Sequence, residues 1–351
     1  MNETMLARLG FVTIITVIVL LLKNVTVPSL AFISVATASS AVLVLTGTFS
    51  LQEMGDFIAE GVKGVHATAA LFIFSVLFFG IMTDVGMFDK IIGALMKKVG
   101  HNVIGVTLMT SIIAMIAHLD GAGAVTDVEI TAGGNVEEQT EAREYARPKL
   151  FWFNLILTLT VIVCLIFVKV PSYYVFMLGC AIALLVNFRG ASLQNKIIKS
   201  HAGPAIMMSS TILCAGVFLG VMEKTGIMNN MATVLAGFVP MSMGRFLPLI
   251  IGVLAVPLTL MFDTDSFFFG LMPVLIEIAG NFGVLPAHIA IVMVVCRNCA
   301  TFISPVVPAT FLGIGLADVE IKDHIKRCFP WIWGVSIVCL LAGLVLGVVK
   351  L

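Results

Sequence analysis

Residues 79–88 read FGIMTDVGMF and residues 219–228 read LGVMEKTGIM, so one pattern occurs twice at a spacing of 140 residues. Each copy follows an apolar span that begins at a histidine, His66 or His201, and each copy precedes an amphipathic stretch. The two segments therefore indicate that the chain contains two copies of one structural unit.

Each copy then leads into a long apolar run that ends in acidic and small residues. These breaks are HLDGAGAVT at 118–126 and FDTDSFFFG at 262–270. Interrupted helices at corresponding positions of two halves are typical of secondary transporters, which bind their substrate at the breaks.

The composition decides the solvent in which this chain folds. It is 60% hydrophobic and 11% charged, with a mean hydropathy of +1.11, whereas soluble domains carry about 25% charged residues. The sequence therefore predicts a polytopic membrane protein in which helices satisfy the backbone within the bilayer. A formal net charge of zero gives no indication of a nucleic-acid partner.

The apolar runs predict nine or ten spans, several of them interrupted. The N-terminal region is broken at Lys23-Asn24, which fits two membrane segments better than a removable signal peptide. The runs are 9–22, 28–46, 66–83, 102–119, 150–168, 171–187, 203–222, 245–262, 285–301 continuing through 302–317, and 330–350. Amphipathic pieces predicted to lie at the interface are 51–65, 86–100, 190–200 and 226–239.

One segment differs in kind from the rest of the chain. Residues 127–149 contain six acids and three bases with few apolar residues, which predicts a solvated loop. The loop divides the chain into an N-terminal membrane repeat, 1–126, and a C-terminal membrane repeat, 150–351.

The first break contains Asp120, Gly121 and Gly123. Each glycine costs a helix about 1 kcal/mol relative to alanine, and backbone N–H groups exposed at such a break can bind an anion. We predict that these three residues contact substrate. The alternative is that Asp120 caps an ordinary turn at the interface.

The second break contains Asp263, Thr264, Asp265 and Ser266. A carboxylate near the bilayer centre costs at least ~2.5–3.5 kcal/mol, so such residues usually face a cavity or a partner. We expect Asp263 and Asp265 to exchange a proton or to contact a hard cation. The alternative is an interfacial turn.

A third polar segment interrupts the last apolar run. Ser304, Pro305, Pro308 and Thr310 lie within ATFISPVVPAT at 300–310. The prolines leave backbone carbonyls free, and the hydroxyls offer neutral hydrogen-bond partners to a ligand rich in carboxylates. A kinked packing helix explains the same spacing equally well.

Arg297 is the single arginine of its span. Its guanidinium could pair with a substrate carboxylate, or with Asp263 or Asp265. Alternatively, the side chain reaches the membrane interface.

Motifs of enzymes are missing from the sequence. It has no Ser-His-Asp order, no HExxH and no P-loop. The chain is therefore predicted not to be an enzyme, and an ion gradient rather than a nucleotide is expected to drive any transport.

Several segments together resemble the citrate–divalent-metal:proton symporter family (CitMHS), of the ion-transporter superfamily. The resemblance covers most of the chain except the charged loop. It rests on LFFGIMTDVGMFDKII (77–92), HLDGAGAVT (118–126), FDTDSFFFGLMPVLIEIAGNFGV (262–284), ISPVVPATFLGIGLADVEIKDH (303–324) and KRCFPWIWGVS (326–336).

This resemblance implies a fold and an activity. The fold is an all-α polytopic membrane protein with two inverted structural repeats, interrupted helices and re-entrant hairpins, often a homodimer. The activity is uptake of citrate in complex with Mg2+, Ca2+ or a related divalent ion, coupled to protons. The metal travels with the substrate, so neither a resident cofactor nor a dedicated metal site is expected. The protein would lie in the lipid bilayer of the cell membrane, with the bacterial inner membrane as the expected location.

Two departures from the family pattern affect this expectation. Arg297 stands where a neutral polar residue is expected, and GAGAVTD runs directly into the charged loop. The first repeat is therefore predicted to be incomplete after residue 126, with the better-preserved site in the C-terminal half. A working transporter, a shortened member that has lost transport, and a membrane sensor that binds an anion all fit. A sodium-coupled transporter of di- or tricarboxylates or other organic anions is a further alternative.

Overall fold

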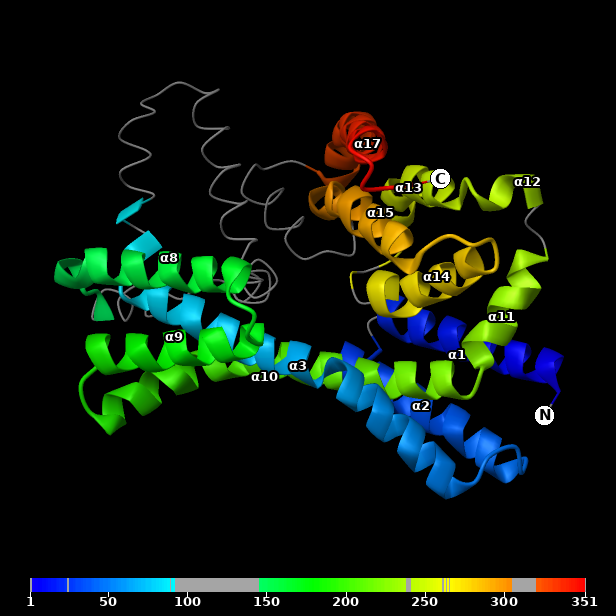
Figure 1. The fold of residues 1–351 in the computed structure, drawn as a ribbon, viewed down its shortest axis with the longest axis horizontal. Coiled ribbons are helices and arrows are strands. Elements are labelled where there is room, and N and C mark those ends of the chain that lie inside the picture. The colour runs from blue at the N-terminus through cyan, green and yellow to red at the C-terminus, as the bar shows by residue number, and fades with distance from the viewer. Residues whose placement is uncertain are drawn as a thin grey trace. The chain divides into compact units, whose positions relative to one another are not determined.

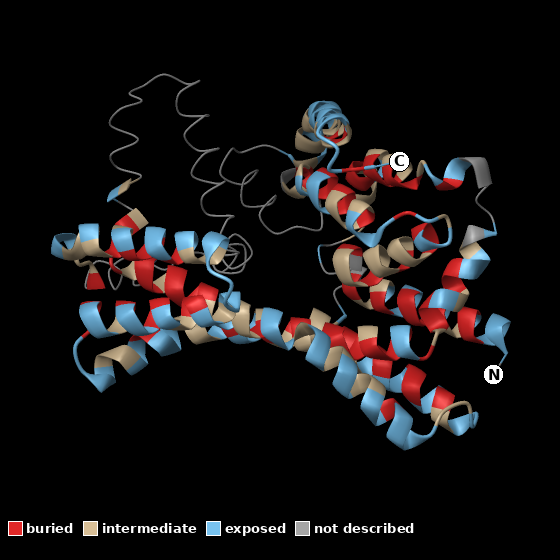
Figure 2. Cartoon of the chain, viewed as in Figure 1, coloured by how far each residue is buried: buried red, intermediate tan, exposed pale blue. Residues whose placement is uncertain are grey.

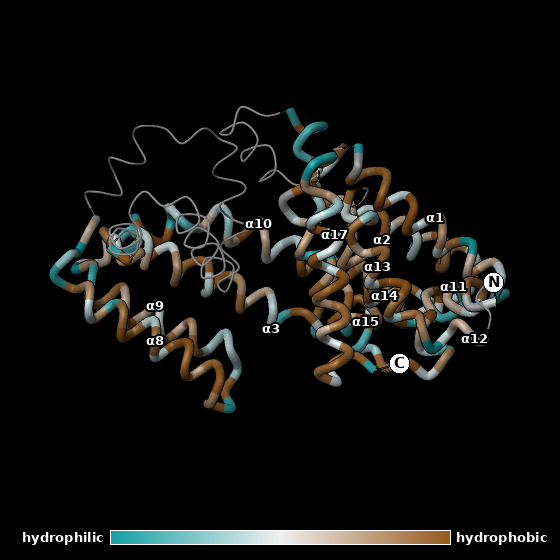
Figure 3. Tube along the Cα trace, turned by 90° about the horizontal axis from the view of Figure 1, so that it is seen from above, coloured by the Kyte–Doolittle hydropathy of each residue, from teal (hydrophilic) through white to brown (hydrophobic). Residues whose placement is uncertain are grey.

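The computed structural model describes residues 2–23, 25–88, 90–91, 145–237, 241–260, 262, 264, 266–304 and 320–350. All regular secondary structure in this part of the chain is helical (Figure 1). Six of the described helices are long and apolar enough to cross a bilayer, and apolar residues occur along most of the helices (Figure 3). The predicted class is confirmed: the chain is an all-α, multi-pass membrane protein.

The described chain divides into two compact units. Unit 1 combines residues 1–64 with residues 213–351, and unit 2 comprises residues 65–212. Two long helices, α3 (Leu51–Asp84) and α10 (Ala191–Lys224), contribute a part to each unit.

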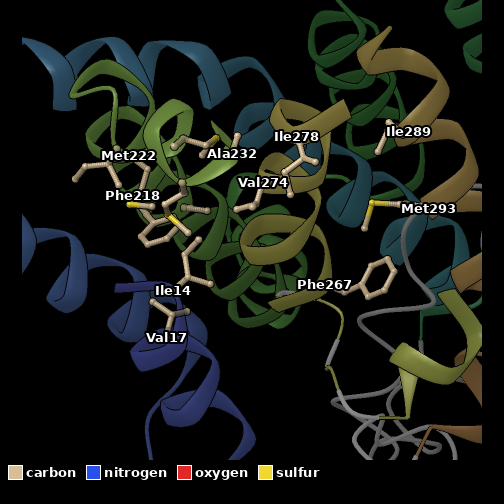
Figure 4. Packing of buried hydrophobic residues seen from close by; sticks show 14 of the residues in the cluster. Ile14, Val17, Phe218, Met222, Ala232, Phe267, Val274, Ile278, Ile289 and Met293 are labelled. Carbon is tan, nitrogen blue, oxygen red and sulfur yellow. The ribbon is translucent and has the colours of Figure 1, made fainter. Parts of the chain in front are cut away.

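Unit 1 contains most of the remaining helices. α1 packs against α2, α11 and η2, α14 packs against α11 and α15, and α13 packs against α15 and α17. Their bounds are α1 (Glu3–Leu22), α2 (Pro28–Leu45), α11 (Ile227–Ala236), α12 (Met241–Gly244), α13 (Leu247–Thr259), the π-helical turn η2 (Ser266–Leu271), α14 (Met272–Gly280), α15 (Pro286–Asn298), the 3-10 turn η3 (Thr301–Ile303) and α17 (Ile321–Val345). Phe218, Met222, Phe267 and Met293 lie in its core (Figure 4).

Unit 2 is built around α8 (Phe151–Phe167) and α9 (Ser172–Asn187), which follow the short turn η1 (Pro148–Leu150). Phe78 and Phe79 of α3 pack edge-on against Phe176 of α9. Two buried amides join α8 to α9, because Asn154 and Asn187 each donate to the side-chain oxygen of the other, at 3.0 and 2.8 Å. The outer faces of α8 and α9 are largely exposed in the chain (Figure 2), and many of their exposed residues are apolar, as lipid contact requires.

The longest helices differ from the predicted spans. The interfacial piece 51–65 and the span 66–83 form the single helix α3, and the pieces 190–200 and 203–222 likewise form α10. A capping box explains where α3 begins. Ser50 donates its backbone N–H and its hydroxyl to Glu53 Oε2, at 2.7 and 2.8 Å, and Glu53 N–H donates to Ser50 Oγ at 3.2 Å. Ser50 and Glu53 thus cap the N-terminus of one continuous helix, and 51–65 is not a separate interfacial element.

α3 and α10 correspond to each other at the spacing of the sequence repeat. Both helices have 34 residues, and their first and last residues are each 140 positions apart. Both end in the same turn, in which Gly86 and Gly226 take positive φ values of 73° and 74°. Because L-residues with a side chain rarely adopt this conformation, glycine is favoured at both positions.

Contacts within each unit show that α3 and α10 run antiparallel. In unit 2, Ser209 Oγ donates to Ala69 O at 3.0 Å, and Gly80 lies against His201. In unit 1, Gly61 lies against Gly220. A contact between residues 140 positions apart, such as Ser209 and Ala69, is expected where two antiparallel copies cross. The inverted repeats themselves stay a prediction.

Two apolar helices of the C-terminal half are too short to cross a bilayer alone. α13 and α15 have 13 residues each, or about 20 Å at 1.5 Å per residue, against a hydrocarbon thickness of about 30 Å. They end beside the polar segments predicted as breaks. α17 begins at Ile321 and contains Pro330, so it starts nine residues before the predicted 330–350 span.

Candidate functional site

The candidate site gathers at the C-terminal end of α15. This helix begins with Pro286 in its first turn, where a missing N–H costs nothing. Arg297 lies in its last turn, where the helix dipole favours a cation. Only 2% of the residue is exposed, so the guanidinium is enclosed by protein. The side chain therefore does not extend to the membrane interface, and its pairing with a carboxylate stays a prediction.

Contacts of Arg297 bring together two of the predicted breaks. Its Nη2 donates to Thr264 Oγ1 at 2.6 Å, and its Nη1 lies 3.4 Å from Thr301 Oγ1. Thr264 belongs to the FDTD segment and Thr301 to the segment that follows α15. The guanidinium also lies 5.5 Å from the ring centroid of Phe268 in η2, within the range of a cation–π interaction.

The arrangement has the features of an anion site. A guanidinium presents five N–H donors in a planar fork that matches a carboxylate. Thr264 and Thr301 fix the fork through hydroxyls, which carry no charge to compete with an anionic ligand. The π-helical geometry of η2 supports this reading, because π-helical segments occur frequently at functional sites.

Ser304 is fully buried in the chain. Its hydroxyl donates to Thr259 O at 2.6 Å, at the end of α13, where helix carbonyls lack partners within the helix. Ser304 was predicted as a substrate ligand. The observed contact gives its hydroxyl proton a structural role, which attaches the segment after η3 to α13.

A second contact stabilises the same end of α13. Pro257 lies inside the helix and has no N–H to donate to the carbonyl of Val253. The indole Nε1 of Trp333, on α17, donates to Val253 O at 2.9 Å instead. Trp333 therefore compensates for the proline.

The other predicted site residues are described only in part or not at all. Ser266 is the first residue of η2. Asp120, Gly121, Gly123, Asp263, Asp265, Pro305, Pro308 and Thr310 lie outside the described residues. Within the described chain, no group of three or more His, Cys, Asp or Glu side chains gathers as a metal site would. Metal contact by Asp263 and Asp265 stays a prediction.

Sequence reasoning missed three contributors to this region. Phe268 and Trp333 were not singled out, and Thr259 was treated as part of an apolar span. Phe268 and Trp333 lie in segments that carried the family resemblance, but apolar side chains give no sign of a hydrogen bond or a ring contact. Only Pro257 gives a sequence signal, because a proline within a helix implies a carbonyl four residues earlier that needs another donor.

Comparisons with known proteins now place this chain among named relatives. It is 27% identical to the citrate transporter and 26% identical to the Mg(2+)/citrate complex secondary transporter, both of Bacillus subtilis (strain 168). An uncharacterized transporter of the same organism is 24% identical. Each match covers 99% of this chain and 100% of the relative.

The chain resembles citrate transporters along nearly its whole length. The resemblance predicted from the motifs is therefore confirmed, although no family model matches the chain. All three relatives have transporter names, in agreement with the prediction that the chain is not an enzyme. The match also supports a location in the bacterial cell membrane.

The lengths of the alignments add one further finding. They run over 431, 436 and 446 residues, whereas this chain has 351. Because the matches cover nearly all of this chain, at least 80 positions of the first alignment have no counterpart in it. The chain is thus shorter than these relatives through internal gaps.

Proposed function

We propose that this protein is a secondary transporter that takes up citrate, or a similar tricarboxylate, in complex with a divalent metal ion and together with protons. One observation carries the proposal. The chain matches the Mg(2+)/citrate complex secondary transporter over 99% of its own residues and 100% of the relative. The buried guanidinium of Arg297, at a break between short helices, supports an anionic substrate.

The metal would be cargo rather than a resident cofactor. Citrate carries three carboxylates, and transfer of uncompensated charge to a low-dielectric site costs several kcal/mol or more. A bound Mg2+ or Ca2+ ion would offset two of those charges, and Arg297 would meet a remaining carboxylate. Ser304 and Thr310, with Pro305 and Pro308 between them, are proposed to contact the substrate from one side.

The proposal also assigns roles to residues of the first break, 118–126, and of the second break, 262–270. Asp120, Gly121 and Gly123 would bind substrate carboxylates at the first break, and Ser266 at the second. Asp263 and Asp265 would exchange the coupled proton or touch the metal. A homodimer in the lipid bilayer is part of the same proposal.

A second candidate function has a specific observation in its favour. At least 80 positions of an aligned citrate transporter have no counterpart in this chain. A shortened first repeat, ending near residue 126, would remove half of the first binding hairpin. Such a protein would bind citrate at its C-terminal site without carrying it across the membrane.

Uptake by purified protein in liposomes tests the proposal. An inward proton gradient should drive entry of labelled citrate, and Mg2+ should increase the rate while EDTA abolishes it. A sodium gradient without a pH difference should drive none. Equal uptake in EDTA would contradict the metal complex as substrate, and uptake that follows sodium alone would contradict proton coupling.

A further inference from the structure

His201 and Asp84 form a close histidine–carboxylate pair in unit 2, whereas Arg297 of the candidate substrate site belongs to unit 1. His201 Nε2 lies 2.8 Å from Asp84 Oδ2, which joins α10 to α3. Both helices are long and apolar enough to span the membrane. Asp84 is the last residue of α3, and His201 lies in the first third of α10.

The ring of His201 occupies a place that only glycine leaves open. A Cβ atom added to Gly80 would lie 2.5 Å from Nδ1 and 2.7 Å from Cε1 of the ring. Gly80 is one helical turn before Asp84, so the same face of α3 supports the ring and supplies its carboxylate. The pair is thus built into the helix crossing rather than formed by two mobile surface side chains.

The corresponding positions in unit 1 show what is special about this pair. Gly61 and Lys224 stand 140 positions from His201 and Asp84, respectively. In unit 1, Gly61 of α3 packs directly against Gly220 of α10. Lys224 Nζ forms a salt bridge with Glu60 Oε2 at 2.7 Å. Lys224 and Glu60 are 40% and 59% exposed, whereas His201 and Asp84 are 17% and 16% exposed. Of these two pairs, the one in unit 2 is the less exposed and contains a histidine.

Two charged residues near this end of the crossing, among those that the structure describes, contact other groups. On α10, the ammonium of Lys196 lies over the ring of Tyr145. Arg147, whose N–H donates to the carbonyl of Val85, directs its guanidinium to the ring of Phe188 and its Nε to Asn187 O. Among the described side chains, Asp84 is the charged group that contacts His201.

We infer that His201 and Asp84 form a proton-binding site that couples protons to transport. With the proton bound, the pair is an imidazolium and a carboxylate and is neutral overall. Without the proton, the carboxylate carries an uncompensated charge at the helix crossing, which favours a different packing or access of water. The transport part of this inference rests on the proposed function, but proton binding by the pair does not.

Proton binding can be measured on the purified full chain without any substrate. NMR of protein with isotopically labelled histidine follows each imidazole with pH, and His201→Gln identifies the His201 signal by its loss. A proton bound by the pair should make the chemical shifts of this imidazole depend on pH. In Asp84→Asn that dependence should change, because the neighbouring carboxylate favours the charged imidazolium.

Matched variants separate this site from general effects. Glu60→Gln removes the carboxylate of the corresponding pair in unit 1, and His66→Gln removes an exposed histidine of α3. Neither should change the response of the His201 signal to pH. An identical response in Asp84→Asn, or no response of His201 to pH, would overturn the inference.

Transport in liposomes then tests the coupling. In His201→Gln and Asp84→Asn we expect citrate exchange to continue while an acid gradient no longer accelerates uptake. Gly80→Ala, which keeps both ionisable groups but displaces the ring, should have the same effect. Acceleration that persists in all three variants would overturn the coupling role. Absence of citrate exchange in the unaltered protein would instead reject the proposed function, and the NMR measurement would still decide on proton binding.

Discussion

Arg297 shows how one residue can combine structure and ligand recognition. Its guanidinium is enclosed by protein and receives support from a hydroxyl on each of two breaks and from an aromatic ring. Because a buried charge is costly unless its hydrogen bonds are satisfied, the neighbouring threonines contribute to stability as well as to orientation. Removal of a single hydrogen-bond donor or acceptor should therefore change stability measurably.

Thr264→Val tests the shorter of the two hydroxyl contacts. The change preserves side-chain shape but removes the acceptor 2.6 Å from Arg297 Nη2, so we expect a loss of about 1–3 kcal/mol in the free energy of unfolding and slower citrate uptake. Thr264→Ser keeps the hydroxyl and should stay close to the unaltered protein. Equal stability and uptake in the two variants would contradict a role for this hydroxyl.

Trp333→Phe tests the contact that compensates for Pro257. Loss of the indole N–H leaves the carbonyl of Val253 without this donor, which should cost about 1–3 kcal/mol in thermal unfolding in detergent. Trp331→Phe is the control on the same helix, since Trp331 is 78% exposed and should change stability by less than about 0.5 kcal/mol.

The same contact can be isolated by a double-mutant cycle. Pro257→Ala restores an N–H that can donate to Val253 O within α13. In that background Trp333→Phe should cost measurably less than it does in the unaltered protein. An identical cost in both backgrounds would show that the tryptophan stabilises the protein through packing alone.

At the scale of elements, the crossing of α3 and α10 dominates. Gly61 of α3 approaches the backbone of Gly216 and Gly220 on α10 so closely that an added Cβ would lie 2.2 Å from Gly216 O. Gly216 and Gly220 have the spacing of the small-residue motif that lets membrane helices approach each other closely. Glycine here serves packing rather than flexibility.

Gly61→Ala should therefore destabilise the protein, although alanine is the better helix former. We expect a cost of about 1–3 kcal/mol from overpacking, measured by thermal unfolding in detergent. Gly64→Ala, three residues later, meets no atom within 4 Å and should be neutral or stabilise the protein by up to about 1 kcal/mol. A stabilising effect of Gly61→Ala would refute the close packing.

Much of this element arrangement could be predicted from the sequence. The 140-residue spacing of FGIMTDVGMF and LGVMEKTGIM marks the shared ends of α3 and α10, because equal side-chain patterns end helices in equal ways. The continuity of α3 was missed, since the polar residues before 66 lower the hydropathy although Ser50 and Glu53 form a helix start. The contact of Arg297 with Thr264 joins residues 33 positions apart. No local pattern encodes such a contact.

At the scale of the whole molecule, composition alone separated a membrane protein from a soluble one. The substrate could not be derived from composition or periodicity, because they do not define the shape of a site. Similarity to citrate transporters over 99% of the chain provides the substrate class. Because this chain lacks at least 80 positions of an aligned citrate transporter, citrate binding and citrate transport have to be measured separately.

Counterflow tests the central claim, that this shorter chain carries citrate across a membrane. Liposomes containing the purified protein are loaded with unlabelled citrate and Mg2+ and diluted into a trace of labelled citrate. We expect labelled citrate to accumulate transiently inside the liposomes above its equilibrium level. Protein-free liposomes should show no such accumulation. Saturable binding of citrate to the protein without any entry of label would contradict the account and favour the shortened, binding-only form.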